Sequence, residues 1–165
     1  MFIDLEPVFK TDGYSETFSY DLDLKDEFVS GIQPFRQPVN ISGRVYNSVG
    51  IVHLDARAKF TLDAVCDRCA EEFSEDFDLE LSHVLVRFLN DDENDEFILA
   101  DESQLNLDEI YREDIFLALP FKFLCSDDCK GLCPQCGKNL NDGPCDCKKP
   151  GDPRFEILQQ LITDD

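Results

Sequence analysis

Eight cysteines are the residues of this chain whose type and spacing could do chemistry. Cys66 and Cys69 form a Cys-x-x-Cys pair, and the other six lie within residues 125–147. Cys133 and Cys136 form a second such pair, in the run Cys-Pro-Gln-Cys-Gly. Proline suits the tight turn between two ligands, and glycine can adopt the positive φ that follows the second. This spacing predicts metal binding, with zinc as the expected ion.

The cysteines can be combined into two tetrahedral four-cysteine sites in more than one way. In the local arrangement, which we favour, one site lies wholly in the tail and the other joins the upstream pair to two tail residues. The ligands would be Cys133, Cys136, Cys145 and Cys147 in the first case and Cys66, Cys69, Cys125 and Cys129 in the second. Alternatively, the two Cys-x-x-Cys pairs share one ion, as in a zinc ribbon, or a single zinc leaves some thiols unused.

Catalytic uses of these cysteines are less well supported. A redox Cys-x-x-Cys needs a thiol of low pKa, whereas Cys66 lies among acidic residues that would raise its pKa. An iron–sulfur cluster fits the number of cysteines, but the long spacers favour zinc. A catalytic zinc would need an open position or a non-cysteine ligand, and we expect the two histidines, His53 and His83, in surface or packing positions. Because known phosphate-loop, nucleophile-elbow and zinc-protease motifs are absent from the sequence, we expect neither an enzyme nor a small-molecule substrate.

The net charge of −21 is the second strong feature of the sequence. Residues 122–154 hold six basic and five acidic residues, while the rest of the chain holds nine basic and 31 acidic. Nucleic acids are bound mainly through Lys and Arg, so the acidic part should repel RNA and suits a basic protein partner, unless its acidity serves only solubility. The basic residues that RNA could contact are Arg68, Lys122, Lys130, Lys138, Lys148, Lys149 and Arg154.

The sequence also predicts a cytoplasmic protein without a membrane partner. The N-terminal run Met-Phe-Ile-Asp-Leu-Glu-Pro lacks the basic and apolar regions of a signal peptide. The longest apolar run, residues 115–121, is too short to span a bilayer. In a reducing compartment, clustered cysteines are expected to bind metal and not to form disulfides.

Alternation of polar and apolar residues predicts several strands. These cover residues 18–24, 39–46, 52–64 and 73–88, with a further short strand at residues 98–99. The first cysteine pair would lie at the tip of a hairpin, and a change of parity near His83 predicts a bulge. Asn106 is the expected N-cap of a helix over residues 107–119. Asp152 and Pro153 would begin a short C-terminal helix.

These elements predict an α+β fold. We expect an antiparallel β meander or barrel-like sheet with a central helix, a C-terminal Cys-rich zinc module and a short C-terminal helix. Residues 1–120 would form the acidic sheet domain. Residues 121–165 would form the zinc-knuckle module and the terminal helix, packed on that domain.

Several runs resemble the YceD family of large ribosomal RNA accumulation proteins, in its cysteine-rich, zinc-binding branch. These are Val-Cys-Asp-Arg-Cys-Ala-Glu-Glu-Phe, the helix end Leu-Ala-Leu-Pro, and the tail Gly-Leu-Cys-Pro-Gln-Cys-Gly-Lys-Asn-Leu-Asn with Cys-Asp-Cys beyond it. The resemblance implies a non-enzymatic factor in 23S rRNA accumulation and large-subunit biogenesis, found in bacteria and plastids. It also implies that Cys66 and Cys69 are the pair common to the family.

The charge adds an expectation about partners that the resemblance does not supply. We expect the sheet and residues 90–114 to bind a basic ribosomal protein, and the segment from Lys122 to Arg154 to contact a 23S rRNA precursor secondarily. The alternative is a zinc-stabilised protein–protein adaptor unrelated to ribosomes.

Overall fold

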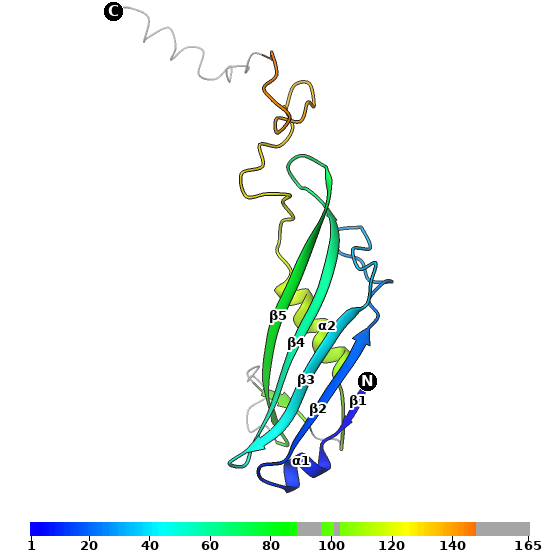
Figure 1. Ribbon diagram of the computed structural model, residues 1–165, viewed down its shortest axis with the longest axis vertical. Coiled ribbons are helices and arrows are strands. Elements are labelled where there is room, and N and C mark those ends of the chain that lie inside the picture. The colour runs from blue at the N-terminus through cyan, green and yellow to red at the C-terminus, as the bar shows by residue number, and fades with distance from the viewer. Residues whose placement is uncertain (89–96, 101–102, 148–165) are drawn as a thin grey trace, which may run out of the picture.

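The computed structural model describes residues 1–88, 97–100 and 103–147 (Figure 1). It has the predicted α+β architecture, with seven strands and two helices in the described residues. In chain order these are β1 (Phe2–Asp4), α1 (Glu6–Lys10), β2 (Ser15–Leu22), β3 (Val39–Ser48), β4 (Ile51–Val65), β5 (Glu72–Val86), β6 (Phe97–Leu99), β7 (Gln104–Asn106) and α2 (Leu107–Ala118).

The main sheet is open, with the strand order β2-β3-β4-β5-β6. Its first four strands form the expected antiparallel meander. The short strand β6 is parallel to β5 and pairs only with the end of that strand, Val84 to Val86. The remaining strands, β1 and β7, form a separate two-stranded sheet. Helix α1 and strand β7 are too short to leave a periodic signal, and sequence patterning did not predict them.

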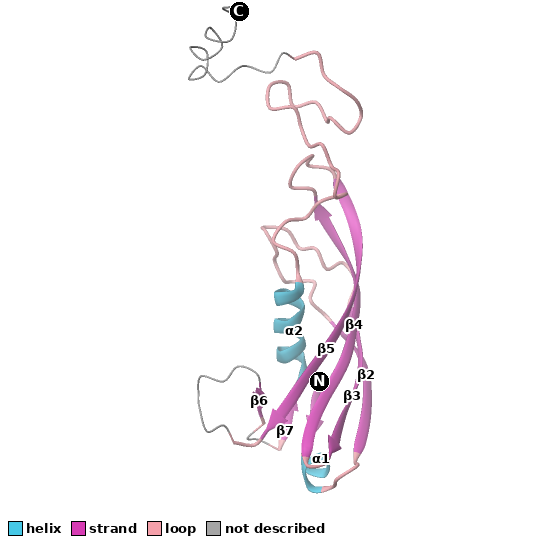
Figure 2. Cartoon of the chain, turned by 90° about the vertical axis from the view of Figure 1, so that its left-hand side faces the viewer, coloured by secondary structure: helices cyan, strands magenta, loops and turns pink. Residues whose placement is uncertain are grey.

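One face of the main sheet is buried, and apolar and polar side chains alternate along β4 without interruption. Every second side chain of β4 points inward and is buried, namely Val52, Leu54, Ala56, Ala58, Phe60, Leu62 and Ala64. Helix α2 lies against this face (Figure 2) and buries Leu107, Tyr111 and Ile115, which recur every four residues on one side of the helix. The other face of the sheet carries the polar half of each strand.

The predicted bulge near His83 is wrong. Strands β4 and β5 keep one register from Val52↔Leu85 to Val65↔Glu72. His83 occupies an inward position, where its Nε2 atom lies 2.7 Å from Oδ2 of Asp114 on α2. The apolar residues Val84 and Val86 point outward at the end of β5 that pairs with β6. His83 is polar but points inward, where it has a partner, and Val84 and Val86 are apolar but point outward beside β6. The sequence pattern therefore looks like a change of parity although the register does not change.

The predicted start of the central helix is confirmed. The side-chain oxygen of Asn106 accepts a hydrogen bond from the backbone N–H of Asp108, with oxygen and nitrogen 3.2 Å apart. Asp108 and Glu109 lie in the first turn, where the helix dipole favours acidic residues. The predicted C-terminal helix lies outside the described residues. Neither described helix is long and apolar enough to cross a membrane.

After α2 the chain runs to the tip of the β4–β5 hairpin, and the cysteine-rich segment extends beyond it (Figure 1). The tip and the segment are joined by reciprocal hydrogen bonds. The backbone N–H of Asp67 donates to the carbonyl of Phe123 over 2.8 Å. The N–H of Phe123 in turn donates to Oδ2 of Asp67 over 2.9 Å. These bonds fix the hairpin tip against the segment that follows α2.

Candidate metal centres

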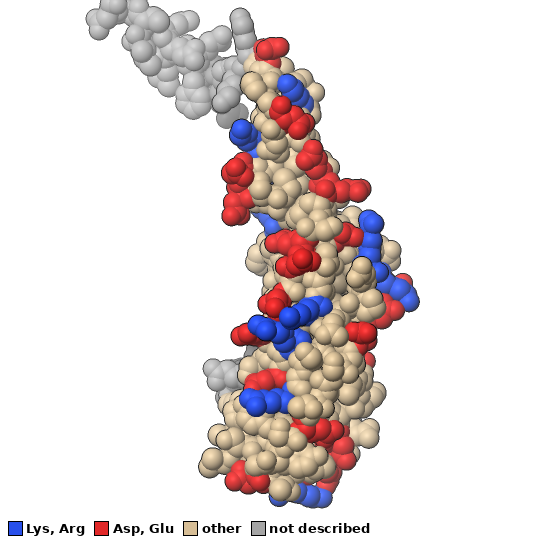
Figure 3. All heavy atoms as spheres, viewed as in Figure 1, with Lys and Arg blue, Asp and Glu red and all other residues tan. Residues whose placement is uncertain are grey.

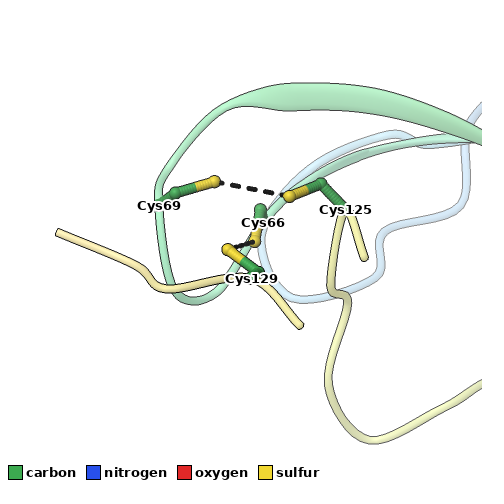
Figure 4. A group of neighbouring side chains, drawn as sticks. All are labelled: Cys66, Cys69, Cys125 and Cys129. Atoms are coloured by element: carbon green, nitrogen blue, oxygen red, sulfur yellow. Dashed lines mark hydrogen bonds between the residues drawn. The ribbon is translucent and has the colours of Figure 1, made fainter. Parts of the chain in front are cut away.

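The first group of thiols lies where the hairpin tip meets this segment (Figure 4). Cys66 and Cys69 come from the β4–β5 turn, and Cys125 and Cys129 come from the chain after α2. The Sγ atoms of Cys66 and Cys129 are 3.8 Å apart, and those of Cys69 and Cys125 are 3.6 Å apart. Tetrahedral zinc with Zn–S bonds of about 2.3 Å would separate its sulfurs by about 3.8 Å. The spacing therefore suits a zinc ion.

The turn that carries the first pair is closed by its own backbone. The N–H of Cys66 donates to the carbonyl of Glu71 over 2.8 Å, and the N–H of Ala70 donates to the carbonyl of Cys66 over 2.9 Å. Ala70 takes a positive φ of 58°, which is uncommon for a residue with a Cβ atom. This tight loop turns the thiols of Cys66 and Cys69 toward the same point.

The second group of thiols is built within the tail alone. It consists of Cys133, Cys136, Cys145 and Cys147, whose Sγ atoms all lie within 4.8 Å of one another. A knuckle holds the first two, since the N–H of Cys133 donates to the carbonyl of Lys138 and the N–H of Gly137 donates to the carbonyl of Cys133. Gly137 has the expected positive φ, 70°. Cys133 is buried, whereas Cys136 is exposed.

In each group the surroundings lower the pKa of some thiols and raise the pKa of others. Burial opposes ionisation of Cys66, but the backbone N–H groups of Cys125, Cys69 and Arg68 outweigh it and lower the pKa of Cys66 to about 6. This shift is opposite to the rise in pKa expected from the acidic residues nearby in the sequence. The N–H groups of Cys136 and Gln135 lower the pKa of Cys133 to about 6.

The partner thiols shift the other way. The pKa of Cys125 rises to about 12, because its thiol shares a hydrogen bond with Cys69 and because it is desolvated. The pKa of Cys147 rises to about 12 through its hydrogen bond with Cys136 and through desolvation. Crowded thiolates repel one another, so each group favours a cation that can neutralise all four.

The two donor sets fit a structural metal. Each offers four sulfurs and no other ligand type, which is the closed, all-cysteine set typical of structural zinc sites. The grouping is that of the local arrangement. In the described residues, Cys66 and Cys69 do not share a group with Cys133 and Cys136, so the zinc-ribbon pairing is not formed. Both groups can therefore hold a metal ion. The tail supplies all four ligands of the second group, and in the first group it supplies two ligands beside the two from the hairpin tip.

The basic residues considered for RNA contact have varied positions. The guanidinium of Arg68 donates from Nη1 to the carbonyls of Cys129 and Asp127, over 3.0 and 3.3 Å. Lys138 donates from Nζ to the carbonyl of Pro144 over 2.8 Å. Lys122 and Lys130 are exposed. The other three, Lys148, Lys149 and Arg154, lie outside the described residues. Arg68 and Lys138 thus help to hold the cysteine segment together.

Sequence reasoning missed two asparagines that support the first group. Asn141 donates from Nδ2 to Sγ of Cys129 over 3.3 Å and accepts from the N–H of Lys130 over 2.7 Å. Asn139 donates from Nδ2 to Oε1 of Glu71 at the hairpin tip over 2.8 Å. The available signal is the Asn-Leu-Asn run that follows the second knuckle. That run belongs to a recognisable motif, but its role depends on tertiary contacts.

Gly131 was missed for the same reason. Its φ is +72°, and a Cβ atom at this position would lie 2.9 Å from the carbonyl oxygen of Arg68. The same carbonyl accepts a hydrogen bond from the N–H of Leu132 over 3.0 Å. A glycine is therefore needed where the tail crosses the first knuckle.

Comparison with known proteins gives several partial matches. A protein of Mycobacterium tuberculosis is 34% identical over 70 residues, which is 42% of this chain and 34% of the relative. The chain thus matches only about a third of the length of this relative. YlbN of Bacillus subtilis is 26% identical over 131 residues, covering 78% of this chain and 76% of the relative. No solved structure matches the chain.

Two plant relatives carry names that describe a role. The large ribosomal RNA subunit accumulation protein YCED homolog 1, chloroplastic, of Arabidopsis thaliana is 27% identical over 144 residues, covering 69% of this chain and 45% of the relative. Its counterpart in Zea mays is 26% identical over 151 residues, covering 72% of this chain and 51% of the relative.

The family comparison covers the part of the chain that carries the two thiol groups. The model of the large ribosomal RNA subunit accumulation protein YceD matches residues 54–162. This match takes in most of β4, all of β5, helix α2 and all eight cysteines. It spans more than half of the chain, and the chain therefore belongs to the YceD family.

Proposed function

We propose that this chain is a non-enzymatic factor in large ribosomal subunit biogenesis, which supports accumulation of 23S rRNA by binding a ribosomal protein, rRNA or both. The observation that carries this proposal is membership of a family described as large ribosomal RNA subunit accumulation proteins. That description names an accumulation factor and no reaction. The cytoplasm, where ribosomal subunits are assembled in bacteria, is the proposed site of action.

The proposed cofactor is zinc, one ion in each group of four cysteines. Its role would be structural, because four thiolates fill a tetrahedral site and leave no position for a substrate. In the first group the ion would tie the β4–β5 turn to residues 125–129. In the second it would close a loop of the tail from Cys133 to Cys147. We accordingly treat residues 121–165 as a module that the first ion attaches to the sheet domain of residues 1–120.

The charge supports a basic protein as the direct partner. The chain has a net charge of −21, so binding to RNA through the whole surface would be unfavourable. The acidic side chains lie on both flanks of the upper part of the molecule in Figure 3. Assembly of a ribosomal subunit requires basic proteins to be delivered to RNA, and an acidic surface can hold such a protein until then. Contact of Lys122 and Lys130 with RNA would be secondary.

The decisive experiment measures ribosomal RNA in cells that lack the chain. We expect the ratio of large- to small-subunit rRNA to fall, and to recover when the intact protein is expressed. The protein should also co-sediment with precursors of the large subunit. An unchanged ratio, together with sedimentation only as a free protein, would exclude the proposed function. It would favour the alternative of a zinc-stabilised adaptor unrelated to ribosomes.

A further inference from the structure

Strand β5 leaves most of one edge open. One side of β5 pairs with β4 from Glu72 to Leu85, whereas the other side pairs with β6 only at Val84 to Val86. Within the described part of the chain, no strand and no loop backbone pairs with this outer edge over residues 73–83. Such an edge presents free N–H and C=O groups that a further strand can pair with.

The outward face of β5 is strongly acidic. Six exposed carboxylates lie between residues 71 and 80, and no Lys or Arg occurs between Cys69 and Val86. Four of them, Glu72, Asp76, Asp78 and Glu80, lie on the outward face, whereas Glu75 has the inward parity of Phe77 and Glu71 precedes the strand. Arg57 on β4 pairs with Asp78 over 2.8 Å and with Glu80 over 2.7 Å. On the outward face, Glu72 and Asp76 form no ion pair with a described residue. Asp76 accepts only a neutral hydrogen bond, from Oγ1 of Thr61 over 2.7 Å, so both charges are available to a cationic ligand.

The inward face of β5 is apolar and only half-buried. Phe77, Leu79 and Leu81 point inward from β5 but stay partly accessible, whereas the facing residues of β4 are buried. Apolar surface therefore flanks the open edge on the helix side.

We propose that residues 72–83 of β5 dock an extended, basic segment of a partner protein, which adds a strand to the sheet. The added strand would place Lys or Arg beside Glu72 and Asp76 on the outward face. Its alternate side chains would be apolar and would pack beside Leu79 and Leu81. Main-chain hydrogen bonds would supply affinity, and the two faces would supply specificity. The identity of the partner as a ribosomal protein rests on the proposed function. The docking edge itself does not depend on that function.

The same features argue against other occupants. Two copies of β5 paired edge to edge would bring carboxylates opposite carboxylates, which is destabilising. RNA would meet an acidic face. A neutral or acidic strand could form main-chain hydrogen bonds but would leave the charges of Glu72 and Asp76 without a cationic partner.

The test uses the full chain and a synthetic peptide of alternating lysine and valine. We expect saturable binding in calorimetry that weakens with salt, and slower hydrogen exchange of the amides of residues 72–83. A peptide of the same composition in scrambled order should bind more weakly. Two further peptides carry methyl groups on alternate backbone nitrogens, one at the odd and one at the even positions. At least one of them should no longer bind, because methylation removes the N–H groups that pair with the edge.

Matched variants separate the edge from general charge. The double variant Glu72→Gln, Asp76→Asn should lower affinity for the peptide about fivefold, as expected for the loss of two exposed ion pairs. The control Asp26→Asn, Glu109→Gln removes two exposed carboxylates elsewhere on the molecule and should leave affinity unchanged. Equal effects of the two variants, binding of every methylated peptide, protection outside β5, or no binding would each overturn the proposal. Co-sedimentation with large-subunit precursors would survive such a failure, so the two proposals can fail separately.

Discussion

The side-chain amide of Asn141 donates a hydrogen bond to the sulfur of Cys129, with nitrogen and sulfur 3.3 Å apart. Cys129 belongs to the first group of thiols, whereas Asn141 lies between Cys136 and Cys145 of the second. The Oδ1 atom of Asn141 also accepts the N–H of Lys130, which fixes the amide in place. One loop therefore contributes to both groups, and the two candidate centres are joined through this side chain.

Replacing Asn141 should loosen the metal in the first group and spare the second. A donor to a ligating sulfur stabilises the thiolate, and loss of such a partner commonly weakens metal binding by about 10- to 100-fold. We expect Asn141→Ala to release one of two zinc ions faster to a chelator, as followed by a colorimetric zinc indicator. Asn40→Ala is the control, because Asn40 bonds Asp21 in the sheet and no residue of either thiol group. Equal release from both variants would contradict a role of Asn141 at Cys129.

Serine substitutions should separate the two centres. Cys66→Ser and Cys133→Ser should each reduce bound zinc from two ions to one, as measured by elemental analysis. Only Cys66→Ser should also speed hydrogen exchange at the hairpin tip, because Cys66 lies in the β4–β5 turn and Cys133 lies wholly in the tail. Exchange in the middle of β4 should stay slow in both variants, since its side chains belong to the main core. Loss of both ions from one variant would show that the centres are not independent.

Two glycines allow backbone strain to be distinguished from a clash. Gly131 and Gly137 have φ values of +72° and +70°, so an alanine at either costs about 1–2 kcal/mol of strain. Only at Gly131 would the new Cβ atom meet a neighbour, the carbonyl of Arg68 at 2.9 Å. Gly131→Ala should therefore speed hydrogen exchange in the β4–β5 turn, whereas Gly137→Ala should affect the second knuckle alone. Similar exchange in the turn for the two variants would mean that the crossing is not tight.

Two buried tyrosines predict a loss of stability at high pH. Burial, followed by nearby charge, raises the pKa of Tyr111 and of Tyr20 well above the ordinary value of about 10. Below pH 10 both rings are neutral in the folded and the unfolded chain, so they contribute no pH dependence. Above pH 10 the unfolded chain loses these protons and the folded chain keeps them, so stability falls. The limiting slope is about 1.4 kcal/mol per pH unit for each tyrosine that stays protonated only in the folded chain, and the total loss is smaller for the less buried Tyr20.

Phenylalanine substitutions provide the check on this prediction. Denaturant unfolding across alkaline pH should show a shallower loss of stability for Tyr111→Phe than for the intact chain. The Tyr111 hydroxyl has no hydrogen-bond partner in the described residues, so Tyr111→Phe should cost little stability at neutral pH. An unchanged alkaline slope in Tyr111→Phe would assign the loss to other groups, such as the thiols.

The sequence alone determined the parts of this protein that depend on local physics. The alternation in β4 indicates a strand that is buried on one face. The start of α2 is indicated by Asn106, whose capping bond to Asp108 involves only three consecutive residues. The short spacing of Cys133 and Cys136 likewise needs only a tight turn. These signals come from neighbours in the chain, so they can be read without knowing the fold.

The tertiary structure alone decided how distant residues meet. Four thiol pairs permit several groupings, and only the position of the β4–β5 turn beside residues 125–129 selects one of them. His83 imitated a bulge because its partner, Asp114, is 31 residues away in the chain. The open edge of β5 and the contact of Asn141 with Cys129 leave no periodic trace in the sequence. Such contacts depend on the folded path of the chain, which local propensity does not encode.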